Sequence, residues 1–210
     1  MKIGIIGATG NAGSRILEEA LRRSLDVTAI VRSKNKLTVD VPVIEKAIET
    51  LQKEDIEAFD VLINAFNAPK DEDHLHELRG KQLIDLVTGT NTRLIVVGGA
   101  GSLFVNPEKT MCFMDLPIVP DFVKPAARSS AKNLEDLRAS SINWTYISPS
   151  AMFDPTGTRT GTYTIGEDTL LTNSTNESYI SMADYAIALI DEVITPGHIN
   201  KRFTVVAEKA

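Results

Sequence analysis

The sequence is poor in cysteine and has no long hydrophobic run. Its 210 residues include one cysteine, Cys112, which alone makes neither an intrachain disulfide nor a thiolate metal site. A lone cysteine agrees with a reducing compartment. No apolar stretch approaches the roughly 18 residues of a membrane span, and the N-terminal residues resemble a buried strand rather than a secretory leader. We therefore expect a cytoplasmic protein without membrane association.

Basic clusters and paired metal ligands are also missing. The formal net charge is −6, so the phosphate backbone of a nucleic acid would be repelled. His74 and His76 are two residues apart, so on a helix they point to different faces and make a poor metal pair. The third histidine, His198, follows a Pro-Gly turn. We expect neither a nucleic acid nor a metal ion as a partner.

Short apolar runs alternate with amphipathic segments along the chain. This alternation predicts βαβ units, and hence a doubly wound parallel sheet of the Rossmann type with helices on both faces. The length suits a single α/β domain over residues 1–210. We expect strands at 3–6, 26–31, 41–46, 61–65, 94–97 and 144–148, and helices at 12–24, 49–55, 71–88 and 122–140.

Residues 151–210 follow a different pattern and are expected to form a substrate-side region. A turn-rich segment at 154–161 leads to residues 162–165 and 169–171, which flank a polar turn like a small hairpin and suggest a lid or pocket wall. A helix is expected up to Ile194, with Ser181 as its N-cap and Asp184 as a capping-box partner. A last strand is expected at 202–207.

Three glycines spaced three residues apart lie between the first predicted strand and the first predicted helix. In such a turn the glycines allow a tight bend, a close approach of pyrophosphate to the backbone, and close packing of helix on strand. The free N–H groups at the helix start, aided by the helix dipole, bind phosphate. Glycine turns also occur without ligands, but this position and spacing predict dinucleotide binding. The residues expected to bind here are Gly7, Thr9, Gly10, Asn11, Ala12 and Gly13.

The end of the second predicted strand indicates which dinucleotide binds. NAD-specific sites place a carboxylate there for the ribose 2′-hydroxyl, whereas this chain has Arg32, Ser33 and Lys34. A guanidinium and a hydroxyl suit a 2′-phosphate, which favours NADP(H) over NAD(H). The alternative is that these are only solvated turn residues. At the end of the fourth predicted strand, the residues expected near the ribose and adenine are Ala65, Phe66 and Asn67.

Together with three further segments, these motifs resemble one protein family. The chain is similar to atypical short-chain dehydrogenases/reductases of the NAD(P)H-binding, NADH-flavin reductase-like group, which are related more distantly to biliverdin reductase B and the NmrA-like regulators. The matching segments are residues 2–13, 31–32, 97–103, 144–149 and 179–186. They span nearly the whole chain and are specific for fold and cofactor, but they say little about substrate because one fold carries many functions.

The resemblance implies that the nicotinamide lies near the ends of the fifth and sixth predicted strands. This agrees with the general position of ligands outside the carboxyl ends of strands in open α/β sheets. The residues implied to line the nicotinamide are Gly98, Gly99, Pro149, Ser150 and Ala151. Those implied to border the substrate are Leu103, Phe104, Met152 and Phe153, although Phe104 and Phe153 could equally be core aromatics.

The chain departs from the usual pattern of the wider family at the catalytic acid. None of its four tyrosines is followed four residues later by a lysine, so the Tyr-x-x-x-Lys pair is missing. Ketone reduction needs a positioned proton donor, whereas a flavin, a quinone or another conjugated acceptor delocalises the charge and can take its proton from solvent. Ser102 and Lys124 remain as candidate catalytic helpers, with capping or solvation as the alternative roles.

Two functional hypotheses follow. The first is an NADPH-dependent reductase that passes hydride to a small, planar, conjugated acceptor such as a flavin or quinone. The second is a non-catalytic NADP(H)-binding sensor that resembles the NmrA-like regulators. A sugar epimerase is disfavoured because such families normally use the missing tyrosine. The sequence favours the reductase, and it leaves open the physiological acceptor, homodimer formation, the stereochemistry of hydride transfer and a bound flavin.

Overall fold

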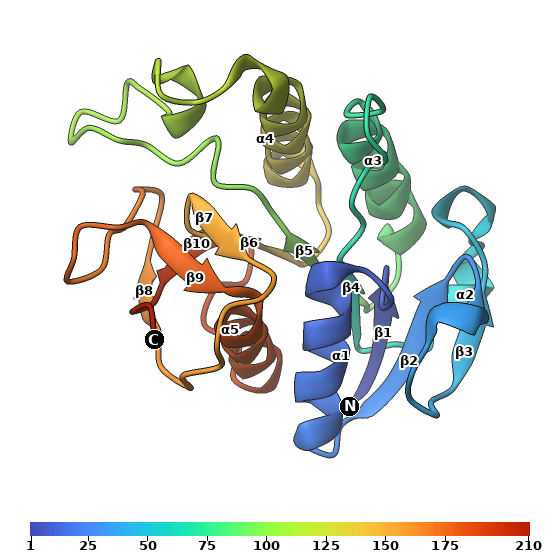
Figure 1. Cartoon of the computed structure of the whole chain (residues 1–210). Helices are drawn as coiled ribbons and strands as arrows, with labels where there is room; N and C mark the ends of the chain where they lie inside the picture. The colour runs from blue at the N-terminus through green and yellow to red at the C-terminus, as the bar shows by residue number, and fades with distance from the viewer.

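Short runs of β-branched and other apolar residues form one large sheet in the computed structural model, which describes residues 1–210 (Figure 1). The parallel strands are β1 (Lys2–Ile6), β2 (Asp26–Val31), β3 (Val43–Glu45), β4 (Val61–Asn64), β5 (Arg93–Val97), β6 (Trp144–Ser148) and β10 (Lys201–Val206). The eighth strand, β8 (Thr164–Gly166), pairs antiparallel with β10 at one edge. The spatial order is β3-β2-β1-β4-β5-β6-β10-β8. The predicted doubly wound, Rossmann-type α/β fold is confirmed.

The chain begins in the middle of this sheet and builds outward in both directions. From β1 it passes to β2 and β3 on one side, and it then returns to β4 on the other side of β1. The carboxyl ends of these strands are level, since Ile6 is in register with both Ile30 and Asn64. A ligand in an open α/β sheet lies outside such strand ends, at the point where the order reverses. By this rule, the edge of the sheet beyond Ile6 is where a ligand is expected.

Helices cover both faces of the sheet. They are α1 (Asn11–Arg22), α2 (Lys53–Ile56), α3 (Leu75–Val87), α4 (Lys124–Ala139) and α5 (Met182–Ile194). Helices α1 and α5 pack together on one face, while α3 and α4 pack together on the other (Figure 1). No helix combines the length and the apolar character needed to cross a membrane.

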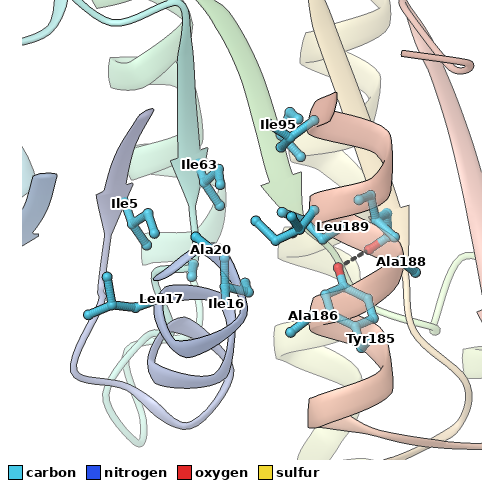
Figure 2. Packing of buried hydrophobic residues seen from close by; sticks show 14 of the residues in the cluster. Ile5, Ile16, Leu17, Ala20, Ile63, Ile95, Tyr185, Ala186, Ala188 and Leu189 are labelled. Carbon is cyan, nitrogen blue, oxygen red and sulfur yellow. Dashed lines mark hydrogen bonds between the residues drawn. The ribbon is translucent and has the colours of Figure 1, made fainter. Parts of the chain in front are cut away.

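Alternation along the central strands divides the interior into two cores. Ile5, Ile63 and Ile95 belong to the core under α1 and α5, and Figure 2 shows them on the sheet opposite Ile16 and Leu189 of these helices. Their sequence neighbours on the strands face the core under α3 and α4. Because side chains on a strand point alternately to opposite faces, these nearly continuous apolar strands are buried on both sides.

Several predicted helix boundaries needed correction. The helix expected at 49–55 is instead a 3-10 turn at Ile48–Thr50 followed by the short helix α2. Gln52 is the N-cap residue of α2, and the carboxylate of Asp55, three residues later, accepts the Gln52 backbone N–H at 2.8 Å as in a capping box. The helix expected from residue 71 begins later, because Asp71 has a φ of +67° and cannot lie within a right-handed helix.

The predicted hairpin of residues 162–165 and 169–171 does not form. Instead β8 pairs with β10, with Ile165 opposite Val205, and Thr169 lies beside Phe104 in an isolated bridge. The sequence also failed to predict a second, two-stranded parallel sheet of β7 (Met152–Asp154) and β9 (Tyr179–Ser181), which are adjacent in Figure 1. These pairings join segments that are distant in sequence, so local turn patterns carry no signal for them.

Ser181 caps α5 as predicted, but Asp184 has a different role from the one expected. The Ser181 Oγ accepts the backbone N–H of Asp184 at 2.9 Å, and its hydroxyl donates to the Asp184 carboxylate at 3.0 Å. That fully buried carboxylate also accepts the N–H groups of Thr160 and Gly161, at 2.9 and 2.8 Å. Asp184 therefore ties the turn-rich segment to α5 rather than completing a capping box.

Candidate cofactor-binding site

The turn between β1 and α1 is built for close approach of another backbone or a ligand. Gly7 has a φ of +74°, and a Cβ there would lie 2.7 Å from the carbonyl oxygen of Ala65. A Cβ on Gly13 would overlap the carbonyl of Gly7, so helix and turn pack too tightly for any larger residue. These constraints explain two of the three glycines of the motif.

The start of α1 offers unshared hydrogen-bond donors. Gly10 is its N-cap residue, and no side chain caps the helix. The first turn contains no acidic residue, so its N–H groups and the positive end of the helix dipole are open to an anion. A pyrophosphate is the anion that suits a glycine-rich strand-to-helix turn. The residues present therefore fit a dinucleotide here, with Thr9, Asn11 and Ala12 beside the glycines.

The carboxylate of Glu45 lies beside the segment that is predicted to bind a 2′-phosphate. The sequence analysis did not identify this residue. Arg32 follows β2 directly and is exposed, and Ser33 is half-buried. Glu45 at the end of β3 is in register with Val31, and its carboxylate accepts the backbone N–H of Lys34 at 3.2 Å. The neighbouring strand therefore brings a carboxylate to this segment, which itself contains no acidic residue. Arg32 and Glu45 have opposite effects on a phosphate bound there.

Phe66 follows the carboxyl end of β4, at the edge of the sheet where a ligand is expected, and it is half-buried. The Asn64 side chain accepts the Phe66 N–H at 3.1 Å and shapes this turn, which continues into the exposed Asn67. The ring of His76 lies edge-on to Phe66, with 5.9 Å between centroids. Burial lowers the pKa of His76, against the opposing charge of Asp73. His76 is therefore a neutral aromatic neighbour of the predicted adenine side near pH 7, a role that its spacing from His74 did not suggest.

The glycine loop after β5 rests on a buried tyrosine. A Cβ on Gly98 would overlap the ring of Tyr146, which lies in β6. The Tyr146 hydroxyl accepts the N–H of Gly99 at 3.1 Å and donates to the carbonyl of Ser130 at 3.2 Å. Burial raises the pKa of Tyr146. Tyr146 thus supports the loop that is predicted to line the nicotinamide, rather than presenting an acid to a substrate.

Of the predicted nicotinamide residues after β6, only Ala151 is exposed. Pro149 and Ser150 are buried. The Ser150 hydroxyl donates to the carbonyl of Val205 at 2.8 Å, so it is satisfied within the protein. A cofactor at this position would contact the backbone after β6 rather than the Ser150 hydroxyl.

The four residues predicted to border the substrate differ in exposure. Leu103 is fully buried, so its side chain does not face a surface open to a ligand. Phe104 is half-buried in a bridge to Cys112, and Phe153 packs on Tyr185 with 4.7 Å between centroids, as core aromatics do. Met152 is 55% exposed. Met152 is therefore the one large apolar side chain of this set that is open to an acceptor.

The two candidate catalytic helpers have different surroundings. Lys124 begins α4, and its ammonium forms an ion pair with Asp121 at 2.7 Å, in a position typical of a surface pair. Ser102 lies in the loop after β5, and its Oγ accepts a hydrogen bond from Arg202 of β10 at 2.9 Å. The sequence did not single out Arg202, because one charged residue in a short strand resembles any exposed edge position.

Comparison with known proteins shows which family this chain belongs to. The NAD(P)H-binding family matches residues 7–193, which is most of the chain. The protein belongs to this NAD(P)H-binding family. The resemblance predicted from the sequence motifs is confirmed.

Relatives of this NAD(P)H-binding protein extend over its whole length. The uncharacterized protein YwnB of Bacillus subtilis is 51% identical over 211 residues, covering 99% of each chain. A Streptococcus pneumoniae structure, of a protein proposed to be an NADH-flavin reductase, is 41% identical with a TM-score of 0.94, covering 99% of this chain and 100% of its own. A Bacteroides thetaiotaomicron structure, of a proposed epimerase, is 35% identical with a TM-score of 0.88, covering 100% of this chain and 98% of its own.

The tyrosines of this NAD(P)H-binding protein are all engaged within the fold. Burial raises the pKa of each of them. Their hydroxyls donate to protein oxygens, with the pairs being Tyr146 to Ser130, Tyr163 to Asp191, Tyr179 to Asp154 and Tyr185 to Ile147. The missing Tyr-x-x-x-Lys pair is therefore not replaced by another tyrosine with a free hydroxyl.

Proposed function

We propose that this protein is an NADPH-dependent reductase that passes hydride to a flavin, a quinone or a similar conjugated acceptor. The observation that carries the proposal is the uncapped start of α1, where free N–H groups, a positive dipole end and the absence of acid side chains suit a pyrophosphate. A bound nicotinamide supplies the hydride. The acceptor takes up a further proton from water.

The residues around this turn would hold the rest of the cofactor. Arg32, exposed beyond β2, supplies a donor fork for a 2′-phosphate, and Glu45 opposes that charge from the end of β3. Phe66 supplies an aromatic edge for the adenine. Gly98 and Gly99, supported by Tyr146, present bare backbone where the nicotinamide would lie. In this proposal the protein binds and orients the cofactor, and the cofactor supplies the hydride.

The nature of the acceptor follows from the missing acid. A simple ketone becomes an alkoxide on hydride transfer and needs a positioned proton donor, whereas every tyrosine hydroxyl here donates to the protein itself. A conjugated ring delocalises the negative charge and therefore depends less on a positioned proton donor. The relation to a protein proposed to be an NADH-flavin reductase supports the same class of acceptor, while an epimerase would need the acid that is missing.

Two measurements test the proposal. Calorimetry with NADPH and NADH measures cofactor binding, and anaerobic mixing of the NADPH-loaded protein with riboflavin, FMN or menadione follows NADPH loss at 340 nm and acceptor bleaching. Gly13→Val, which places a side chain against the Gly7 carbonyl, should abolish binding, while Lys132→Ala on the surface of α4 is the matched control.

Reduction of an acceptor at a rate well above that of free NADPH, lost in Gly13→Val, would support the reductase. Tight binding without reduction of any acceptor would contradict it and would favour the non-catalytic sensor. No heat from either cofactor would overturn both hypotheses.

A further inference from the structure

A buried arginine connects the last parallel strand to the loop that follows β5. Arg202 is 6% exposed and lies in β10 in register with Tyr146 of β6. Its guanidinium donates to the Asp168 carboxylate at 2.6 Å, and on its other side to both the Oγ and the carbonyl oxygen of Ser102, at 2.9 and 3.0 Å. Ser102 is thus held through its main chain and its side chain at once.

The direction of the bond between Arg202 and Ser102 determines what the serine can do. A guanidinium has five N–H donors and no acceptor, so the Ser102 oxygen must act as the acceptor in this pair. Arg202 is the only protein partner of that Oγ. The Ser102 hydroxyl proton therefore has no acceptor within the chain, and the side chain is half-buried rather than enclosed. The hydroxyl is left as a donor for a bound molecule.

The charges around Ser102 favour this donor role. Asp168 is shared between Arg202 and Arg138, whose guanidinium lies 3.4 Å from the carboxylate, so its negative charge does not neutralise Arg202 alone. A hydroxyl that accepts from a cation is a stronger donor through its own proton, because successive hydrogen bonds polarise one another. The buried guanidinium thus strengthens the Ser102 O–H as a donor.

The other titratable groups nearby do not reverse this effect. The Cys112 thiol donates to the Ser102 carbonyl at 3.7 Å, and burial raises its pKa, so it stays neutral near pH 7. Tyr146 is also neutral, because burial raises its pKa. Asp115 accepts the backbone N–H of Cys112 at 3.1 Å, but it is exposed and screened by water and salt.

We propose that Arg202 is a positioning residue that turns the Ser102 hydroxyl into a hydrogen-bond donor to the acceptor, at the atom where negative charge develops. The inference rests on the proposed reductase function. Ser102 keeps its own proton, and the proton that the reduced acceptor gains comes from water. The pair of Arg202 and Ser102 fills part of the role that the missing tyrosine and lysine play in the wider family.

The first test is independent of turnover and uses a thiol as a reporter. In a Cys112→Ala background, Ser102→Cys places a single thiol beside Arg202, and its ionisation is followed by thiolate absorbance at 240 nm and by the pH dependence of alkylation. We expect its pKa to lie at least about 1 below the ordinary value of about 8.5, since a cation within hydrogen-bond distance favours the thiolate. Adding Arg202→Gln should return it to that value, and Arg202→Lys, which keeps the charge, should leave part of the shift.

The second test uses kinetics with NADPH and the flavin or quinone that turns over fastest. Ser102→Ala and Arg202→Gln should each lower kcat about tenfold, as expected for loss of one charge-assisted donor to the reacting group, with little change in KM for NADPH. The double variant should be no slower than either single variant. Ser102→Thr, which keeps a hydroxyl, and Arg202→Lys should recover part of the rate.

The outcomes distinguish a failure of the Arg202–Ser102 inference from a failure of the proposed reductase function. A thiol pKa that is ordinary, or that does not respond to Arg202, would overturn the inference, as would kinetic losses that multiply in the double variant. Absence of turnover in the wild-type protein would overturn the reductase function, and the thiol titration would still decide whether Arg202 polarises position 102.

Discussion

Replacing Tyr146 by phenylalanine tests whether this tyrosine supports the glycine loop or acts in catalysis. The hydroxyl accepts the Gly99 N–H at 3.1 Å and donates to the Ser130 carbonyl at 3.2 Å, and the ring is buried under Gly98. Phenylalanine fills the same space, so no cavity term arises. The Gly99 N–H loses its partner, and a buried, unsatisfied group costs about 1–3 kcal/mol, whereas the Ser130 carbonyl lies within α4 and loses only one of its hydrogen bonds, worth about 1 kcal/mol. Because the Gly99 N–H is only half-buried and can reach water, its cost should lie near the lower end, and together with the hydrogen bond lost at Ser130 the total is about 2 kcal/mol.

The assay compares stability with turnover in the same preparation. For a chain of this size about 2 kcal/mol corresponds to a fall in Tm of roughly 4–8 °C, measured by calorimetry or by urea unfolding. Because the Gly98-Gly99 loop loses its support, KM for NADPH should rise while kcat changes less than about threefold; loss of a general acid would instead lower kcat by about 100-fold or more.

Tyr163→Phe is the matched control for this substitution. Its hydroxyl donates to Asp191 at 2.6 Å, and that carboxylate keeps Arg23 as a partner, so we expect a loss below about 1 kcal/mol. A Tyr146→Phe protein as stable as Tyr163→Phe would refute the supporting role. A 100-fold fall in kcat with unchanged stability would show that Tyr146 acts on the substrate.

Further substitutions test the cofactor site and one buried charge cluster. Gly13→Ala places a methyl group against the Gly7 carbonyl and should weaken NADPH and NADH binding alike by calorimetry, at least tenfold; unchanged affinity would contradict the assigned turn. Arg32→Glu should weaken NADPH binding far more than NADH binding, and Glu45→Gln should shift the preference toward NADPH; equal effects on both cofactors would count against the phosphate assignment. Burial alone would raise the pKa of Glu192, but hydrogen bonds from His198 and Arg93 lower it below its ordinary 4.5. The stability from the Glu192 carboxylate is therefore present above pH 4.5 and is lost as the pH falls through its folded-state pKa, so urea unfolding of wild type and Glu192→Gln should converge in acid; a constant difference would show that ionisation of Glu192 contributes nothing.

Local patterns in the sequence predicted the framework of the site. The strands leading to Gly7 and Arg32 were placed correctly from their apolar runs, and the glycine spacing indicated the turn before α1. Ser181 was recognised as a cap from the few residues around it. In each case the signal lies within a few residues of chain, because strand alternation, helix capping and glycine turns are short-range effects.

Contacts between distant segments were not predictable in the same way. Glu45 reaches the Lys34 N–H only because β2 and β3 pair in a particular register. Asp184 binds the segment at Thr160 rather than completing a capping box, since the chain returns over the start of α5. The hairpin predicted near residue 165 was replaced by pairing with β10, a strand whose position in the sheet no local pattern specifies.

The sequence by itself determined the Rossmann-type fold, the family and the glycine turn before α1, because each depends on residues that are neighbours in the chain. Only the tertiary structure decided that Tyr146 supports the glycine loop and that Arg202 meets Ser102, since these partners are 47 and 100 residues apart. Sheet order and strand register bring such groups together, and both are set by packing of the whole chain rather than by any segment of it.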